Sequence, residues 1–218
     1  MKNILLIFAS FYALQSCAVE SNETASHSSS ESVELEKKKS PSKNLEVAYF
    51  ASGCFWCVEE IFEAVKGVDE VYSGYSGGII KNPTYEEICT GRLRHAEAVK
   101  VIYDPSVVSF ETLVDVFFNS HDPSTFNRQG PDSGPQYRSI AFYSKEIERE
   151  VILIKIKALK ATNAWNKITT EVKKFDVFYM AEDYHQDYIV NHPNNGYVQS
   201  VSIPRFENFK EKMPEILK

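Results

Sequence analysis

The spacing of hydrophobic residues from residue 45 to the C-terminus predicts a mixture of strands and helices. Short hydrophobic runs, or alternation of hydrophobic with polar residues, predict strands at 46–51, 71–75, 96–103, 137–143 and 169–175. Hydrophobic residues three or four positions apart predict helices at 54–67, 82–91, 109–117, 145–161 and 181–190. Strands and helices do not alternate regularly, which favours an α+β domain with helices packed on an antiparallel or mixed sheet.

Two of these helices carry detailed expectations. Asn82 is expected to cap the second helix, with Pro83 at its first position, because proline is favoured there. In the helix at 145–161, the side chains expected to face the core are those at helical spacing: Ile147, Val151, Ile154 and Ala158.

The N-terminal 44 residues differ from the rest of the chain. Lys2 precedes an apolar run from residue 4 to 14, which is too short to span a bilayer and is typical of a signal peptide. The sequence at 14–17 resembles a bacterial lipoprotein signal, so Cys17 is a candidate for lipidation; cleavage after Ala18 is the alternative. Residues 18–44 are rich in Ser, Glu and Lys and predict a disordered tether to a domain at 45–218. We therefore expect an exported protein, periplasmic or anchored to a membrane.

Composition narrows the function classes. The chain has 218 residues, is 43% hydrophobic and has a net charge of −6, with no cluster of Lys and Arg of the kind that binds nucleic acid. It has four cysteines, of which Cys17 belongs to the leader. The folded part keeps Cys54, Cys57 and Cys89, and this odd number argues against a purely structural set of disulfides.

Cys54 and Cys57 are the strongest candidates for chemistry. Cys54 follows Gly53 at a predicted helix start, where backbone N–H groups are expected to lower the pKa of a thiol. Cys57 lies three residues further on the same helix face, so the two can form a disulfide. Phe55 and Trp56 between them suggest an apolar pocket, although core packing is the plain alternative for both rings.

Five segments in order resemble a known family. They are GCFWCVEE (53–60); GY, GG and NPTY between 74 and 85; HAEAV and YDP between 95 and 105; HDP and RQGPDSGPQYRS between 121 and 139; and AEDYHQ (181–186). Together they resemble the A-type peptide-methionine (S)-S-oxide reductases over about residues 46 to 205. The resemblance implies a ferredoxin-like two-layer sandwich, no cofactor or metal, and reduction of methionine (S)-sulfoxide, free or in proteins.

The resemblance also assigns roles to single residues. Cys54 would attack the sulfoxide sulfur, and Glu97 would donate a proton to its oxygen. The remaining matches are Tyr85 and Tyr137, which would hold the oxygen, Asp132 as a further polar residue, and Phe55 and Trp56, which would enclose the methyl group. It gives no catalytic role to His95, His121 or His185, which we expect to be structural.

The attack leaves Cys54 as a sulfenic acid, which needs a second thiol. Many family members use a cysteine after a Gly-Tyr near the C-terminus, but here Gly196-Tyr197 is followed by Val198. We therefore expect Cys57 to resolve Cys54, with Cys89, predicted to be buried, as its rival. The family implies thioredoxin as reductant; an exported enzyme would need a thioredoxin-like partner outside the cytoplasm, and we expect a monomer.

Two other functions compete with this interpretation. A general thiol-disulfide oxidoreductase would also place Cys-x-x-Cys at a helix start. A zinc-binding structural module could use Cys54, Cys57, Cys89 and His95, although their spacing is not that of a common zinc finger.

Overall fold

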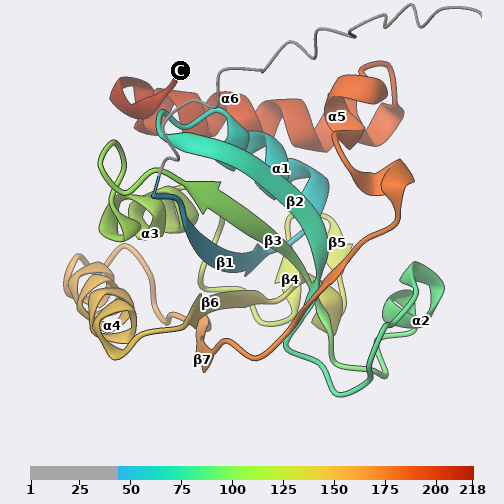
Figure 1. Cartoon of the computed structure of the whole chain (residues 1–218), viewed down its shortest axis with the longest axis horizontal. Coiled ribbons are helices and arrows are strands. Elements are labelled where there is room, and N and C mark those ends of the chain that lie inside the picture. The colour runs from blue at the N-terminus through green and yellow to red at the C-terminus, as the bar shows by residue number, and fades with distance from the viewer. Residues whose placement is uncertain (1–43) are drawn as a thin grey trace, which may run out of the picture. The chain divides into compact units, whose positions relative to one another are not determined.

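A curved six-stranded sheet organises the part of the chain that the computed structural model describes, residues 44–218 (Figure 1). The expected signal peptide, Cys17 and all but the end of the expected tether lie outside the described residues. The strands of the sheet are β1 (Glu46–Ser52), β2 (Val68–Ser76), β3 (Ala96–Tyr103), β6 (Ser139–Tyr143), β7 (Glu171–Lys174) and β8 (Phe178–Met180). Their order is β7-β6-β1-β3-β2-β8, and β6 with β7 is the parallel pair among them. The α+β class is therefore confirmed.

The remaining elements connect and cover this sheet. Strands β4 (Arg128–Gln129) and β5 (Asp132–Ser133) form a separate small hairpin. The α-helices are α1 (Phe55–Glu63), α2 (Tyr85–Cys89), α3 (Phe110–Asn119), α4 (Glu146–Ala161), α5 (Tyr188–Asn191) and α6 (Ile203–Lys212). Short turns of other helix types are η1 (Pro135–Tyr137), η2 (Asp183–His185), η3 (Val198–Ser202) and η4 (Pro214–Ile216). None of the helices within residues 44–218 is long and apolar enough to cross a membrane.

The main hydrophobic core lies between the sheet and helices α1 and α3. Stacked rings of Phe50 from β1, Phe62 from α1 and Phe117 from α3 form its centre. The opposite face of the sheet carries a smaller cluster that includes Ala96 and Ala98. Because side chains alternate along a strand, Glu97 lies between these alanines but projects to the helix-covered face. The buried position of Glu97 therefore follows from the alternation of β3.

Helix α2 begins later than its sequence predicted. Thr84, not Asn82, is the N-cap: its hydroxyl accepts a hydrogen bond from the Glu87 backbone N–H, and the Glu87 carboxylate accepts one from the Thr84 N–H. Asn82 has a left-handed backbone with φ 49°. The reciprocal capping box satisfies two N–H groups that would otherwise have no partner, which explains why the helix starts there.

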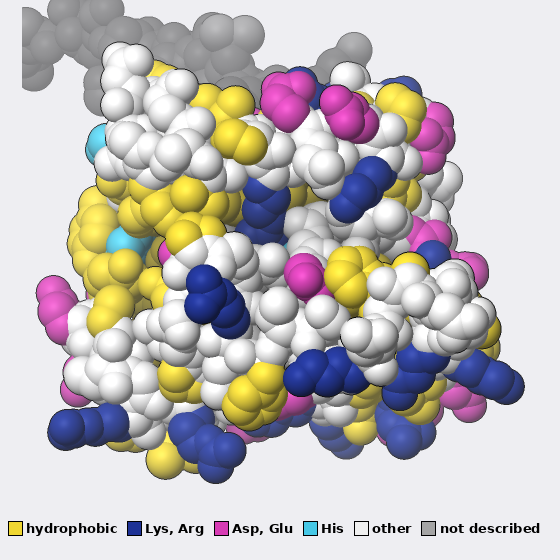
Figure 2. Space-filling view, turned by 180° about the vertical axis from the view of Figure 1, so that it is seen from behind, with side chains coloured by type: hydrophobic (Ala, Val, Ile, Leu, Met, Phe, Trp, Pro, Cys, Tyr) yellow, Lys and Arg dark blue, Asp and Glu magenta, His cyan; other side chains and the backbone are white. Residues whose placement is uncertain are grey.

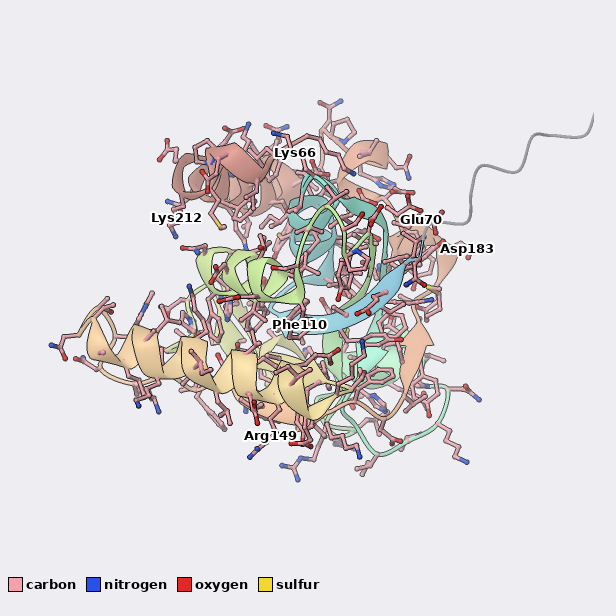
Figure 3. All side chains as sticks on the ribbon, turned by 60° about the vertical axis from the view of Figure 1, so that its left-hand side comes forward. Lys66, Glu70, Phe110, Arg149, Asp183 and Lys212 are labelled. Carbon is pink, nitrogen blue, oxygen red and sulfur yellow. The ribbon has the colours of Figure 1, made fainter. Side chains whose placement is uncertain are left out.

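Helix α4 buries a face that agrees only in part with the predicted one. Of the predicted residues Val151 packs against the core, whereas Ile147 and Ile154 are 62% and 67% exposed, and the buried residues are Ile152 and Ile156. Hydrophobic residues lie on more than one face of this helix, so spacing alone did not identify the packed one. Figure 3 shows Arg149 on the outer side of α4 and Phe110 between α3 and α4.

The C-terminal part differs most from the prediction. The helix expected at 181–190 is divided into η2 and α5, because Asp187 takes a left-handed conformation with φ 52°. Strand β8 and helix α6 have no predicted counterpart. On the face in Figure 2, hydrophobic side chains gather at the left of the view, and Lys and Arg side chains lie mainly along the lower part.

Candidate active site

Most of the predicted site residues line one cavity of about 310 Å³. The lining residues are Cys54, Phe55, Trp56, Tyr85, Glu97, Asp132, Tyr137, Asn195 and Tyr197. They come from the start of α1, the start of α2, strand β3, the segment from β5 to η1 and the chain before η3. The structure thus brings together every predicted catalytic or substrate-binding residue except Cys57, which lies behind the cavity wall.

A tight turn at Gly53 places Cys54 at the cavity. Gly53 has φ +92°, and a Cβ atom there would lie 2.6 Å from the Cβ atom of Gln129. Only glycine fits this conformation and this close approach. The turn ends β1 and begins α1, with Cys54 as the N-cap residue. The nucleophile candidate is therefore held by the backbone and not by a flexible loop.

Glu97 is an acid held neutral by its surroundings. It is 2% exposed, and its Oε2 accepts a hydrogen bond from the Phe55 backbone N–H at 3.0 Å. Burial raises the pKa of Glu97 to about 8, with a smaller contribution from the charge of Asp132, while the Phe55 bond acts in the opposite direction. A carboxyl group with this pKa retains its proton near neutral pH and can donate it.

The two cysteines share their ionisation. Burial raises the pKa of the Cys54 thiol, and its hydrogen bond with Cys57 acts in the same direction. That same bond lowers the pKa of Cys57 to about 6. The pair therefore loses one proton readily and keeps the other between the sulfurs. The prediction that backbone N–H groups at the helix start lower the pKa of Cys54 was wrong. The Cys54 sulfur makes no capping hydrogen bond, and the Glu97 carboxylate accepts the hydrogen bond of the first N–H of α1.

Cys57 is enclosed by the C-terminal part of the chain. Its Sγ is hydrogen-bonded to Ser202 Oγ at 3.1 Å, and this bond and the Arg205 guanidinium also lower its pKa. Arg205 in turn donates to the carbonyls of Ser120 at 2.8 Å and Ser52 at 2.9 Å. Helix α6 and the end of β1 thus fix a positive charge near the second thiol.

Hydroxyl groups surround the rest of the cavity. Burial raises the pKa of Tyr85 and of Tyr137, so both keep their protons and can donate hydrogen bonds. Tyr197 Oη donates to Asp132 Oδ2 at 2.5 Å, and burial raises the pKa of Asp132 above its ordinary value. Tyr197 was missed in the sequence, where Gly196-Tyr197 drew notice only for the cysteine that does not follow it.

A hydrogen-bond network behind the cavity positions Trp56 and Tyr85. The Trp56 indole N–H donates to His185 Nδ1 at 3.1 Å, and the indole stacks on Tyr188 at 3.6 Å. Glu182 accepts from the Tyr85 backbone N–H at 3.0 Å and from Tyr75 Oη at 2.7 Å. Both acceptors come from the AEDYHQ segment, so its likeness to the family was the one signal for them in the sequence.

The other sulfur and histidine candidates lie differently. Cys89 is exposed at the end of α2, so the expectation that it is buried was wrong; Tyr85 donates a hydrogen bond to it, which lowers its pKa against the larger effect of desolvation. Neither His95 nor His121 lines the cavity, and His121 is buried against the Phe117 carbonyl and Ser139. Within residues 44–218, no three His, Cys, Asp or Glu side chains gather as metal ligands would, so the four zinc-ligand candidates do not form one cluster.

Comparisons with known proteins agree with this geometry. A sequence model of the family described as peptide methionine sulfoxide reductase matches residues 46–216. The chain is 47% identical to the peptide methionine sulfoxide reductase MsrA of Pasteurella multocida over 171 residues, 78% of this chain and 98% of that protein. It is 43% identical to the MsrA of Picrophilus torridus over 167 residues, 77% and 94% of the two chains.

Solved structures give the same result. Methionine sulfoxide reductase A of Corynebacterium diphtheriae superposes with a TM-score of 0.64 and 38% identity, over 69% of this chain and 76% of the other. Reduced Mxr1 from Saccharomyces cerevisiae superposes with a TM-score of 0.65 and 33% identity, over 72% and 90%. By sequence and by structure, this chain belongs to the MsrA family and is a peptide methionine sulfoxide reductase.

Proposed function

We propose that Cys54 attacks the sulfur of methionine (S)-sulfoxide while Glu97 protonates the departing oxygen. The observation that carries this proposal is a buried carboxyl with a pKa of about 8 lining the same cavity as a cysteine at a helix N-cap. The sulfur of a sulfoxide is a poor electrophile unless its oxygen is protonated, so the acid must hold its proton at neutral pH. Burial of Glu97 meets this requirement.

The cavity fixes three of the groups around the sulfur. The oxygen lies toward Glu97 and the hydroxyls of Tyr85 and Tyr137, and the methyl group lies against the rings of Phe55 and Trp56. The sulfur then faces Cys54, and the remainder of the substrate extends to the cavity mouth. Because three positions are set, the mirror-image sulfoxide would exchange its methyl and oxygen sites. This placement supports preference for one epimer, which family membership identifies as (S).

The first half-reaction balances within the site. The ionised Cys57 takes the proton of Cys54 across their hydrogen bond as the Cys54 sulfur bonds to the sulfur of the substrate, and Glu97 protonates the substrate oxygen. The hydroxyl group so formed passes to the Cys54 sulfur, the S–O bond of the substrate and the new S–S bond break, and methionine leaves with its sulfur reduced by two electrons. Cys54 is oxidised to a sulfenic acid.

The second half-reaction uses the buried neighbour. The Cys57 sulfur attacks the Cys54 sulfenic acid, the S–OH bond breaks as the Cys57 proton passes to the departing hydroxyl, water is released and the Cys54–Cys57 disulfide forms; Glu97 recovers its proton from solvent. Their mutual hydrogen bond supports this pairing. Cys89 is exposed and contacts Tyr85, not Cys54, so it is a weaker candidate. A reductant with two thiols, which we propose is a thioredoxin-like protein, then restores the pair.

Replacement of Cys54 tests the scheme directly. Cys54→Ser should abolish reduction of the (S)-sulfoxide, and the wild type should leave the (R)-sulfoxide unchanged, as measured by chromatography of each epimer. Cys57→Ser should complete one turnover and then stop, with a sulfenic acid on Cys54 by mass analysis, whereas Cys89→Ser should cycle normally. Normal turnover by Cys54→Ser would overturn the attack, and cycling Cys57→Ser would overturn the resolving role.

We further propose that the enzyme is monomeric and is exported as a periplasmic protein or lipoprotein, with Cys17 lipidated and residues 18–44 as tether. The supports are the apolar run at 4–14 and the lipoprotein-like sequence at 14–17. Metabolic labelling with a palmitate analogue, compared between wild type and Cys17→Ala, tests the lipid. For the fold, the order β6-β1-β3-β2 with antiparallel neighbours and helices α1 and α3 on one face supports a ferredoxin-like core.

A further inference from the structure

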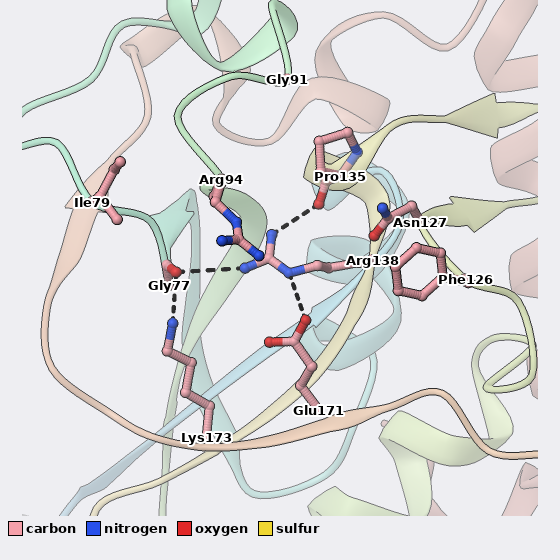
Figure 4. A pocket seen from close by; sticks show the side chains of 10 residues that line it. All are labelled: Gly77, Ile79, Gly91, Arg94, Phe126, Asn127, Pro135, Arg138, Glu171 and Lys173. Carbon is pink, nitrogen blue, oxygen red and sulfur yellow. Dashed lines mark hydrogen bonds and ion pairs between the residues drawn. The ribbon is translucent and has the colours of Figure 1, made fainter.

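A second hollow, of about 430 Å³, is lined by three cationic side chains (Figure 4). We call it the basic pocket and define it by Gly77, Arg94, Arg138, Glu171 and Lys173. Glu171 is the carboxylate among its lining residues, so three positive charges and one negative charge leave a formal excess of two positive charges. The whole chain has a net charge of −6, which makes this local excess opposite in sign to the protein.

Two of the cations are fixed in place. The buried Arg138 donates through Nε to Glu171 at 3.0 Å, through Nη1 to the Pro135 carbonyl at 2.8 Å, and through Nη2 to the Gly77 carbonyl at 3.5 Å. Lys173 Nζ donates to the same Gly77 carbonyl at 2.7 Å. Their positions are therefore set by the scaffold before any ligand arrives, which lowers the entropy cost of binding one.

Without a ligand, the position of Arg94 is unfavourable for the stability of the protein. Within residues 44–218 it makes no hydrogen bond or ion pair, and its guanidinium lies beside that of Arg138 (Figure 4). This like charge adds to burial in lowering the pKa of Arg138. The Arg94 backbone is left-handed with φ 58°, a conformation that is strained for a residue other than glycine. An anion between the two guanidinium groups would relieve the repulsion.

Residues close in the sequence line the basic pocket and the active-site cavity. Pro135 lines the basic pocket and Tyr137 lines the cavity, and Arg94 precedes Glu97 by three residues. Spans of two and three residues cover at most about 7 and about 11 Å. At these points the backbones that line the two hollows are therefore no further apart than about three or four extended residues can span. Ile79 and Phe126, which are 76% and 72% exposed, line the basic pocket and offer apolar contacts to such a chain.

We propose that the basic pocket binds an acidic side chain of the polypeptide whose oxidised methionine occupies the active site. A planar carboxylate matches the fork of two donors that a guanidinium presents. The pocket would therefore select oxidised methionines with Asp or Glu about three or four residues away. This inference rests on the proposed chemistry at Cys54, but it concerns which polypeptides reach that cysteine.

Capped peptides of equal length test the proposal. Each contains one methionine (S)-sulfoxide and, three and four residues away on both sides, either Glu, Gln or Lys. The wild type should show a KM for the Glu peptide about 5-fold to 10-fold below that for the Gln peptide, and the highest KM for the Lys peptide. Arg94→Gln and Lys173→Gln should each reduce this preference, and added salt should weaken it. Arg149→Gln, with the same change of charge on the outer side of α4, should keep it.

The outcomes separate the inference from the function. N-acetyl methionine sulfoxide N-methylamide has no carboxylate, so Arg94→Gln should reduce it at the wild-type rate. Equal KM values for the Glu and Gln peptides in the wild type would overturn the proposal, as would a preference that survives both pocket substitutions. If phosphate or citrate raises the melting temperature of the wild type but not of Arg94→Gln while the peptides show no preference, the pocket holds free oxyanions and the proposal fails.

Discussion

The active-site cavity and the basic pocket treat ionisable groups in opposite ways. In the cavity, aromatic rings and burial hold Glu97, Tyr85 and Tyr137 in their protonated, neutral forms. In the basic pocket, carbonyls and Glu171 accept hydrogen bonds from Arg138 and Lys173. One hollow of the fold therefore holds groups suited to proton transfer, and the other holds groups suited to the recognition of charge.

The difference teaches that the identity of a side chain does not decide its role. Glu97 and Glu171 are both glutamates on strands of the same sheet. Glu97 is 2% exposed, and its hydrogen-bond donor is a single backbone N–H, whereas Glu171 is partly solvated and paired with a guanidinium. Desolvation favours the acid form of Glu97, whereas Glu171 makes an ion pair with Arg138.

Removal of the neutral acid should give the largest effect. Glu97→Gln keeps an oxygen that can accept the Phe55 N–H but cannot transfer a proton, so we expect kcat/KM to fall about 10²-fold to 10³-fold. The wild-type pH profile should rise near pH 6, as the cysteine pair ionises, and fall near pH 8, as Glu97 loses its proton. The variant should lose the fall near pH 8. A variant that retains both activity and profile would show that Glu97 is not the proton donor.

The same substitution should change the pH dependence of stability. The pKa of Glu97 is raised from 4.5 to about 8 in the folded state, so the folded protein binds more protons than the unfolded one between these values. Stability contributed by this group is complete below about pH 4.5 and is lost as the pH rises to about 8.

The melting temperature of Glu97→Gln, measured relative to that of the wild type, should therefore be higher at pH 8.5 than at pH 5. The change should be several degrees, since about 1 kcal/mol corresponds to about 2–4 °C in a domain of this size. Thermal unfolding of both proteins at the two pH values measures it. Glu59, whose pKa burial raises to about 8, is present in both and cancels. A difference that is independent of pH would contradict the raised pKa of Glu97.

A moderate effect is expected at the wall of the cavity. His185→Leu leaves the Trp56 indole N–H without its acceptor, and we expect kcat/KM to fall about 5-fold to 10-fold, the loss of roughly one hydrogen bond of positioning. His185→Gln retains an oxygen that can accept and should lose less. Steady-state kinetics with both epimers would also report weaker discrimination in the leucine variant. Equal losses of kcat/KM in the two variants would indicate that the volume of the His185 side chain matters, and not its ability to accept the Trp56 hydrogen bond.

The smallest effect concerns the basic pocket without its ligand. Arg94→Gly removes a left-handed arginine and its repulsion with Arg138, so we expect the melting temperature to rise by about 2–4 °C, the equivalent of roughly 1 kcal/mol. Arg94→Asn, which tolerates the same backbone, should rise less. A fall in both variants would show that Arg94 stabilises the fold, which would remove the argument that it is retained to bind an anion.

Some of this architecture follows from local pattern and some does not. The alternation in 96–103 predicted β3 with its bounds, and the helix predicted at 109–117 is α3, whose N-cap is Ser109. Helix α4 carries isoleucines on several faces, so its packed face depends on partners distant in the sequence. The break at Asp187 depends on a backbone angle that leaves no hydrophobic pattern.

The site shows the same division. Resemblance to the family led to Glu97 and Asp132, which residue patterns alone would have placed on a solvated face or in a turn. Tyr197 reaches Asp132 from 65 residues away, and no local feature marks that contact. Reasoning from the helix start gave the wrong direction for the Cys54 pKa because desolvation, a property of the assembled fold, outweighs the local dipole.

The burial of Cys57 decides how the oxidised enzyme can be regenerated. Cys54 lines the cavity and Cys57 does not, so an incoming thiolate meets only the Cys54 sulfur of the proposed disulfide. Cys57 is then the leaving group, and the Arg205 guanidinium, which lowers the pKa of this thiol, favours its departure as an anion. The mixed disulfide should always form on Cys54, and the reductant must wait until methionine has vacated the same opening, so the kinetics should be ping-pong.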